Sequence, residues 1–70
     1  MKKENLLFDQ YMRSLSTSER NVVLRDICEA CGVSTNVVYF WRVGRSRLKR
    51  VYMDKITEIV GKNIFSNVDN

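Results

Sequence analysis

The spacing of apolar residues near the start of the chain has the period of an amphipathic helix. The apolar positions there are Leu7, Tyr11, Met12 and Leu15. Because these positions repeat with the helical period, their side chains share one face, and the polar residues Asp9, Gln10 and Arg13 between them are expected to face water. The pattern predicts a first helix over Leu6–Leu15.

A capping box follows and marks the start of a second helix. Ser16 stands three residues before Glu19, and in this arrangement the hydroxyl and the carboxylate each satisfy a backbone N–H near the helix start. The apolar positions of this helix also share one face: Leu24, Ile27, Cys28 and Cys31. The helix is expected to end at Cys31, whereas the weak helix formers Asn21–Val23 leave its first residue open.

A glycine then separates the second helix from another apolar stretch. Gly32 can take the left-handed conformation that ends a helix and that strains any residue with a Cβ atom. Val33 is expected to fill the corner between the helices, and Ser34 is a suitable N-cap for the next one. The sequence therefore predicts a helix-turn-helix over residues 24–44.

The third helix is predicted from Thr35 to Arg42 or Val43. Its β-branched and aromatic run, Val37–Trp41, could also form a strand when taken alone. The serine cap before it and Gly44 after it favour the helix.

A fourth helix is predicted over Arg50–Val60, with Gly61 as its stop. Its apolar positions are Tyr52, Ile56, Ile59 and Val60. Beyond it, Ile64 and Phe65 either fold back onto the core or extend to pair with a second subunit, and the sequence leaves both open.

Length and composition favour one small all-α domain. The chain has 70 residues, three glycines and no proline, and 44% of it is hydrophobic, which is typical of a helical domain with few turns. We expect a single domain over residues 1–70 with an ordered core at about 6–65. No apolar run approaches the ~20 residues of a membrane span, and residues 1–5 lack a signal-peptide pattern. A cytoplasmic protein without a membrane partner is expected.

Positive charge is concentrated in one part of the chain. The net charge is +4, and the segment between Ala30 and Met53 holds five bases and no acid. The five bases are Arg42, Arg45, Arg47, Lys49 and Arg50. A basic cluster alone is often only a solvated surface, but this one lies in and just after the third helix of the predicted motif, where contacts to nucleic-acid phosphates would need cations.

A turn of about 100° per residue divides the third helix into two faces. Val38 and Trp41, with Ser34 one turn earlier, point toward the core. The opposite side collects Asn36, Tyr39, Phe40 and Val43, with Thr35 at the exposed end. The alternative is that Tyr39 or Phe40 packs beneath the first helix or the C-terminal segment.

The outward residues suit the major groove of double-stranded DNA. Asn36 can bond N6 and N7 of adenine, and Thr35 and the apolar side chains can meet thymine methyl groups. The base-facing candidates are Thr35, Asn36, Tyr39 and Phe40, although the Tyr39 hydroxyl could equally bond a phosphate. The phosphate-contact candidates are Ser34, Arg45, Arg47 and Lys49, which would fix register without reading sequence.

The two cysteines stand at CxxC spacing. A zinc site needs four ligands, and the chain contains no cysteine beyond Cys28 and Cys31 and no histidine. The pair also falls at the end of a helix, whereas thioredoxin-like pairs precede one. We expect both to pack as small apolar residues, with an intersubunit metal or redox role as the alternative.

An enzyme is poorly supported by this sequence. It has no histidine, no glycine-rich phosphate loop and no acid pair in an evident pocket. We expect no catalytic residues, no metal, no cofactor and no small-molecule ligand.

A family resemblance rests on the helix-turn-helix itself. The residues that carry it are Leu24, Ile27, Cys28, Cys31, Gly32, Val33, Ser34, Val38, Trp41, Gly44 and Arg45. Their spacing resembles the motif of phage Cro/CI-type (lambda repressor-like) proteins, which have a small residue at the position of Cys28 and glycine at that of Gly32. The family also has bulky apolar residues where Val38 and Trp41 stand. The resemblance implies a DNA-binding domain of four or five helices over Leu6–Phe65.

In that family the residues at the positions of Thr35, Asn36 and Phe40 commonly face bases. Phe40 departs from the pattern, because these positions are often polar, and it leaves open an apolar contact or a protein partner. The sequence predicts a prokaryotic or phage transcriptional regulator, a repressor that binds operator DNA as a homodimer. The alternative is a protein-interaction module, such as an antirepressor or antitoxin, that uses the face formed by Tyr39, Phe40 and Val43.

Overall fold

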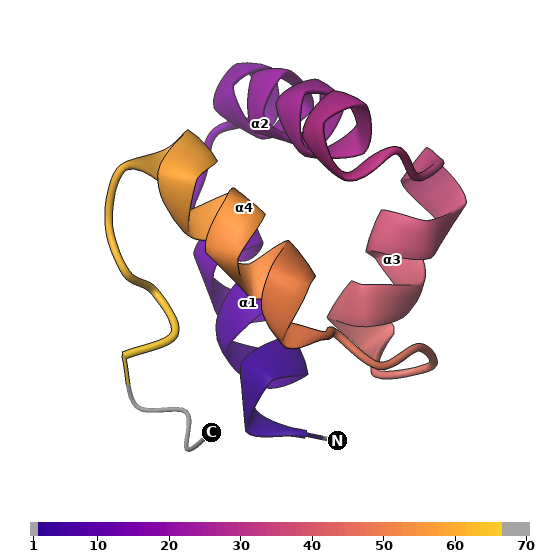
Figure 1. Cartoon of the computed structure of the whole chain (residues 1–70). Coiled ribbons are helices and arrows are strands. Elements are labelled where there is room, and N and C mark those ends of the chain that lie inside the picture. The colour runs from indigo at the N-terminus through magenta and orange to yellow at the C-terminus, as the bar shows by residue number, and fades with distance from the viewer. Residues whose placement is uncertain (1, 67–70) are drawn as a thin grey trace.

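Four α-helices make up most of the computed structural model, which describes residues 2–66 (Figure 1). The helices are α1 (Lys3–Arg13), α2 (Thr17–Cys31), α3 (Thr35–Val43) and α4 (Arg50–Val60). Residues 2–66 contain no strand, so the predicted all-α class is confirmed. None of the helices in this part of the chain has the length and apolar character that crossing a membrane requires.

The first helix lies earlier in the chain than predicted. It starts at Lys3 and ends at Arg13, whereas the apolar pattern placed it over Leu6–Leu15. The early end has a physical cause, because Arg20 of α2 takes two carbonyl groups there: its Nε donates to Met12 O at 2.9 Å and its Nη2 to Leu15 O at 3.0 Å. The arginine thus caps the C-terminal end of α1 and joins it to α2.

The second helix starts at the predicted capping box. The Glu19 N–H donates to the Ser16 hydroxyl at 3.2 Å, and the Ser16 N–H donates to the Glu19 carboxylate at 3.0 Å. With both donors of the box satisfied, the helix runs unbroken from Thr17 through the weak helix formers 21–23. Residues 21–23 are therefore helix.

The turn between α2 and α3 has the predicted geometry. Gly32 has φ 67° and ψ 36°, in the left-handed region, and its N–H donates to Cys28 O at 2.9 Å. The Ser34 hydroxyl then accepts the Val37 N–H at 3.4 Å and caps α3. The stretch 37–41 is helical, so the strand alternative is wrong.

The core sits between the four helices and has Trp41 at its centre. The Trp41 ring meets Phe8 edge-on at 6.3 Å between ring centroids and Tyr52 at 4.9 Å. The buried apolar residues are Phe8, Met12, Ile27, Val38, Trp41, Leu48, Met53, Ile56 and Phe65. Phe65 is buried and Ile64 partly buried against this cluster, which confirms that the chain folds back after α4.

The packing places α3 at the edge of the molecule. α1 and α2 both contact α3, and α2 also contacts α4. In Figure 1, α3 forms the right-hand side of the structure, with the loop 44–49 at its lower end. One side of α3 therefore meets the core, and the other faces away from it.

Candidate nucleic-acid interface

The two faces of α3 differ sharply in burial. On the inner face, Val38 is 0% exposed and Trp41 1% exposed. On the outer face, Tyr39 is 55% exposed and Val43 37% exposed. The inner face fixes the helix to the core, and the outer face is accessible to a binding partner.

Three of the four predicted base-facing residues lie exposed on this outer face: Thr35, Asn36 and Tyr39. They come from the first five residues of α3, so one helix presents a hydroxyl, an amide and a phenol together. The exposure of Tyr39 shows that the alternative of burial is wrong for this residue. The predicted outward position of these side chains is confirmed, and their contact with bases is a prediction.

Phe40 is only half-buried. The guanidinium carbon of Arg45 lies 5.4 Å from the centre of its ring, and the Tyr39 ring lies 6.1 Å away. An arginine at this distance from a ring face is held by a cation–π attraction. Phe40 thus supports Arg45 at the border of the outer face, a contact that the sequence pattern did not indicate.

A short basic loop follows α3. Its cationic residues Arg45, Arg47 and Lys49 are all exposed, whereas Leu48 is buried in the core. The Arg45 N–H also donates to Phe40 O at 2.8 Å. The loop is therefore tied down by an apolar side chain and by its backbone while its charges face water.

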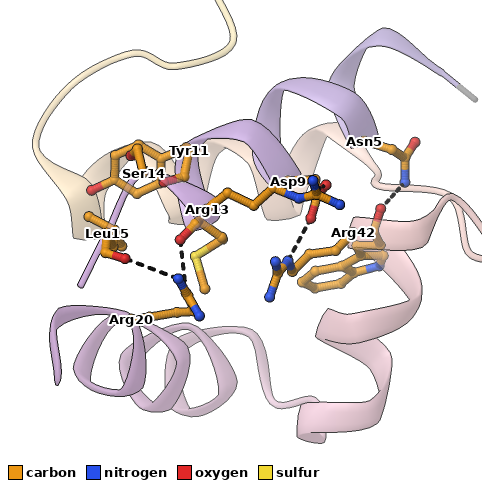
Figure 2. A network of polar contacts seen from close by, with 10 residues as sticks. Asn5, Asp9, Tyr11, Arg13, Ser14, Leu15, Arg20 and Arg42 are labelled. Atoms are coloured by element: carbon orange, nitrogen blue, oxygen red, sulfur yellow. Dashed lines mark hydrogen bonds and ion pairs between the residues drawn. The ribbon is translucent and has the colours of Figure 1, made fainter. Parts of the chain in front are cut away.

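Asn5 of α1 holds the start of this loop. Its side-chain amide donates to Trp41 O at 2.8 Å and to Ser46 O at 3.0 Å, and the residue is 2% exposed. Figure 2 shows Asn5 pointing from α1 toward the end of α3. Because these carbonyl groups lie at the end of α3 and in the loop after it, Asn5 sets the position of the loop relative to the outer face.

Arg42 differs from the other cations of the basic segment. Its Nε donates to Asp9 Oδ1 at 2.8 Å, and both side chains are partly buried. Arg50 pairs with Asp54 at 3.5 Å, in an exposed contact. The expectation that Asp9 faces water was wrong, because this carboxylate takes part in the packing of α1 against α3. The charge that remains beside the outer face comes mainly from the loop.

Ser34, the fourth predicted phosphate contact, is exposed. Its hydroxyl oxygen accepts the Val37 N–H, so it serves as the cap of α3. A hydroxyl also has a donor hydrogen, which remains available for a phosphate oxygen.

The two cysteines, Cys28 and Cys31, pack against the core. Both are free and partly buried. Burial raises the pKa of the Cys28 thiol, and Glu29 adds to this effect. Burial also raises the pKa of Cys31, with Lys55 opposing the shift and Cys28 adding to it. Raised pKa values disfavour the thiolate that redox chemistry and metal binding need, which supports a packing role.

Residues 2–66 contain no group of three or more metal-ligating side chains close enough to hold an ion. The structure does bring together the exposed outer face of α3 and the basic loop, and α1 anchors both. Comparison of the chain with protein-family models, with curated proteins and with solved structures found no match.

Proposed function

We propose that this chain is a sequence-specific DNA-binding transcriptional regulator, a repressor of the Cro/CI type, that reads operator DNA with α3 in the major groove. One observation carries the proposal: α3 is locked by a fully buried inner face, yet it leaves Tyr39 and Val43 exposed on the outer one. A small domain gains stability by burying such side chains, so their exposure is better explained by a binding role.

The outer face has the chemistry to read base edges. The Asn36 amide offers both a donor and an acceptor, the pair that adenine N7 and N6 require. Thr35 and Val43 present methyl groups that suit the thymine methyl. One good bidentate contact discriminates between bases by about 1–3 kcal/mol.

The basic loop supplies contacts to the DNA backbone. Arg45, Arg47 and Lys49 are exposed at the end of α3, and phosphates line the groove that the helix would enter. Contacts of this kind supply affinity and register but carry no sequence information.

A single domain of this size covers only a few base pairs, so we propose that it binds as a symmetric homodimer. Two linked half-sites supply the affinity that one lacks. Repression then follows from occlusion of the promoter, with no small-molecule effector, and the protein works in the cytoplasm.

A protein-interaction module is the second candidate. The observation that favours it is the contact between the exposed Tyr39 ring and the Phe40 ring, since paired aromatic residues are frequent anchors of protein interfaces. The two functions respond differently to salt, because DNA binding releases counterions and an aromatic interface does not.

The test is selection of bound duplexes from a random DNA pool, followed by titration of the selected duplex at increasing salt. The proposal expects a palindromic consensus and an affinity that falls steeply between low and moderate salt. The variant in which Arg45 and Arg47 are both alanine should bind all duplexes more weakly and lower the salt slope by about one unit for each lost contact. No enrichment of any sequence, or a salt-independent interaction, would contradict the proposal.

A further inference from the structure

A groove lies between α1 and α3, next to Tyr39 at one border of the outer face. It has a volume of about 360 Å³ and is lined by Asp9, Arg13, Tyr39, Arg42 and Val43. Tyr39 and Val43 also belong to the outer face, so the groove opens directly beside it. We call it the α1–α3 groove.

Two arginines meet one carboxylate in the α1–α3 groove. Arg13 Nε lies 2.9 Å from Asp9 Oδ2, and Arg42 Nε lies 2.8 Å from Asp9 Oδ1. Figure 2 shows both side chains converging on Asp9. The cluster keeps one excess positive charge, and Asp9 holds both guanidinium groups in place.

Arg13 is the accessible member of the cluster. Its side chain is 75% exposed. A guanidinium has five N–H donors, so a contact through Nε leaves the terminal nitrogens able to bond a second acceptor. Charge-assisted bonds from arginine to phosphate oxygens are among the strongest that proteins form.

A second groove continues along the same side of α3. Its volume is about 330 Å³, it shares Tyr39 and Arg42 with the first, and it extends to Asn36 and Arg20. This side of the outer face is therefore lined by arginine from two other helices, although neither Arg13 nor Arg20 belongs to the basic segment of the sequence.

The outer face of α3 has two flanks, one at Tyr39 and one at Phe40, and each flank receives positive charge from a different part of the chain. At about 100° per residue, Tyr39 and Phe40 fall on opposite sides of Asn36 and Val43. Arg45 lies over Phe40, and Arg13 lines a groove with Tyr39. The major groove has a phosphate backbone along each edge, so a helix within it needs cations on both flanks.

We propose that the α1–α3 groove binds a backbone phosphate of duplex DNA, with Arg13 as the contacting cation, Asp9 as its positioning residue and the Tyr39 hydroxyl as a further donor. The basic loop contacts the backbone on one edge of the major groove, and this phosphate belongs to the strand on the opposite edge. This inference rests on the proposed function and adds to it a second phosphate-binding flank.

The test compares Arg13→Gln with Arg25→Gln on the selected duplex. Arg25 is an exposed arginine of α2 outside both grooves, so the two variants lose the same charge. The proposal expects Arg13→Gln to weaken binding to specific and non-specific duplexes alike and to lower the salt slope by about 0.9, the value for one phosphate. Arg25→Gln should keep the parent slope, and Arg13→Lys, which retains the charge, should restore it.

Two results would overturn this inference in different ways. If the parent binds the duplex and Arg13→Gln behaves as Arg25→Gln does, the α1–α3 groove is not a phosphate site, and the proposed function stands. If the parent binds no duplex, both proposals fail together. Equal thermal unfolding of the parent and Arg13→Gln shows that lost binding does not come from lost folding.

Discussion

Each face of α3 carries a valine and an aromatic residue, but the two pairs differ in what surrounds them. Val38 and Trp41 on the inner face are at most 1% exposed, whereas Tyr39 and Val43 on the outer face are 55% and 37% exposed. Sequence neighbours thus meet opposite environments because the helix turns by about 100° per residue. Core packing therefore accounts for the apolar residues of the inner face only, and those of the outer face are better explained by a binding partner.

The largest loss of stability is expected from a substitution on the inner face. Trp41→Ala removes the ring that packs between Phe8 and Tyr52 and should lower the free energy of unfolding by about 3–5 kcal/mol. Tyr39→Ala, the matched change on the outer face, should stay within about 0.5 kcal/mol of the parent, as surface substitutions usually do. Urea denaturation followed by circular dichroism measures both. Equal losses would mean that the outer face belongs to the core.

The next prediction concerns Asn5, which holds the basic loop against the end of α3. Asn5→Ala removes the side-chain amide donor of Ser46 O and of Trp41 O, which keeps only the Gly44 N–H at 3.3 Å. The loss should cost about 1–3 kcal/mol of unfolding free energy. The loop should also loosen, so the Arg45 N–H should exchange faster with solvent deuterium. Asn21→Ala, at an exposed position of α2, serves as the control. It should not lower the free energy of unfolding, because alanine favours the helix more than asparagine does, and it should leave the exchange of the Arg45 N–H unchanged.

Most helix boundaries of this chain could be predicted from its sequence. The ends of α2, α3 and α4 follow from local chemistry, because Gly32, Gly44 and Gly61 each take a positive φ beside their own helix. The cap of α2 is equally local. Binary patterning likewise separated the faces of α3, since burial of one stripe follows from helical periodicity.

The contacts that position the candidate site are not local. Asn5 bonds a residue 36 positions away, and Asp9 bonds one 33 positions away. A polar residue of an amphipathic helix is expected to face solvent unless its distant partner is known, so the sequence placed Asp9 toward water and gave Asn5 no role. The α1–α3 groove could not be predicted for the same reason, since it forms only when α1 packs on α3.

A third prediction sharpens the role of the outer face. Asn36→Ala should leave the unfolding free energy within about 0.5 kcal/mol of the parent, because the residue is exposed. It should remove about 1–3 kcal/mol of discrimination at one base pair of the operator. Competition binding against duplexes with single base changes measures this preference. A preference profile identical to that of the parent would exclude Asn36 from base reading.

The smallest effect concerns the capping box at the start of α2. Hydrogen bonds from the Ser16 backbone and hydroxyl lower the pKa of the Glu19 carboxyl below its ordinary value of 4.5. A lowered pKa in the folded state contributes stability above the ordinary pKa, and this contribution is lost as the pH falls through the folded value. In Glu19→Gln the loss of thermal stability on acidification should therefore be slightly smaller than in the parent. The same acid dependence in both proteins would argue against this role of the capping box.

The proposed function requires that the outer face of α3 contacts duplex DNA, and amide NMR of the labelled protein tests this contact most directly. On titration with the selected duplex, the account predicts the largest shift changes on the outer face and its two flanks: at Arg13, Thr35, Asn36, Tyr39, Val43, Arg45 and Arg47. Shift changes confined to the surface around the exposed Val22 on α2, or no changes at all, would contradict it.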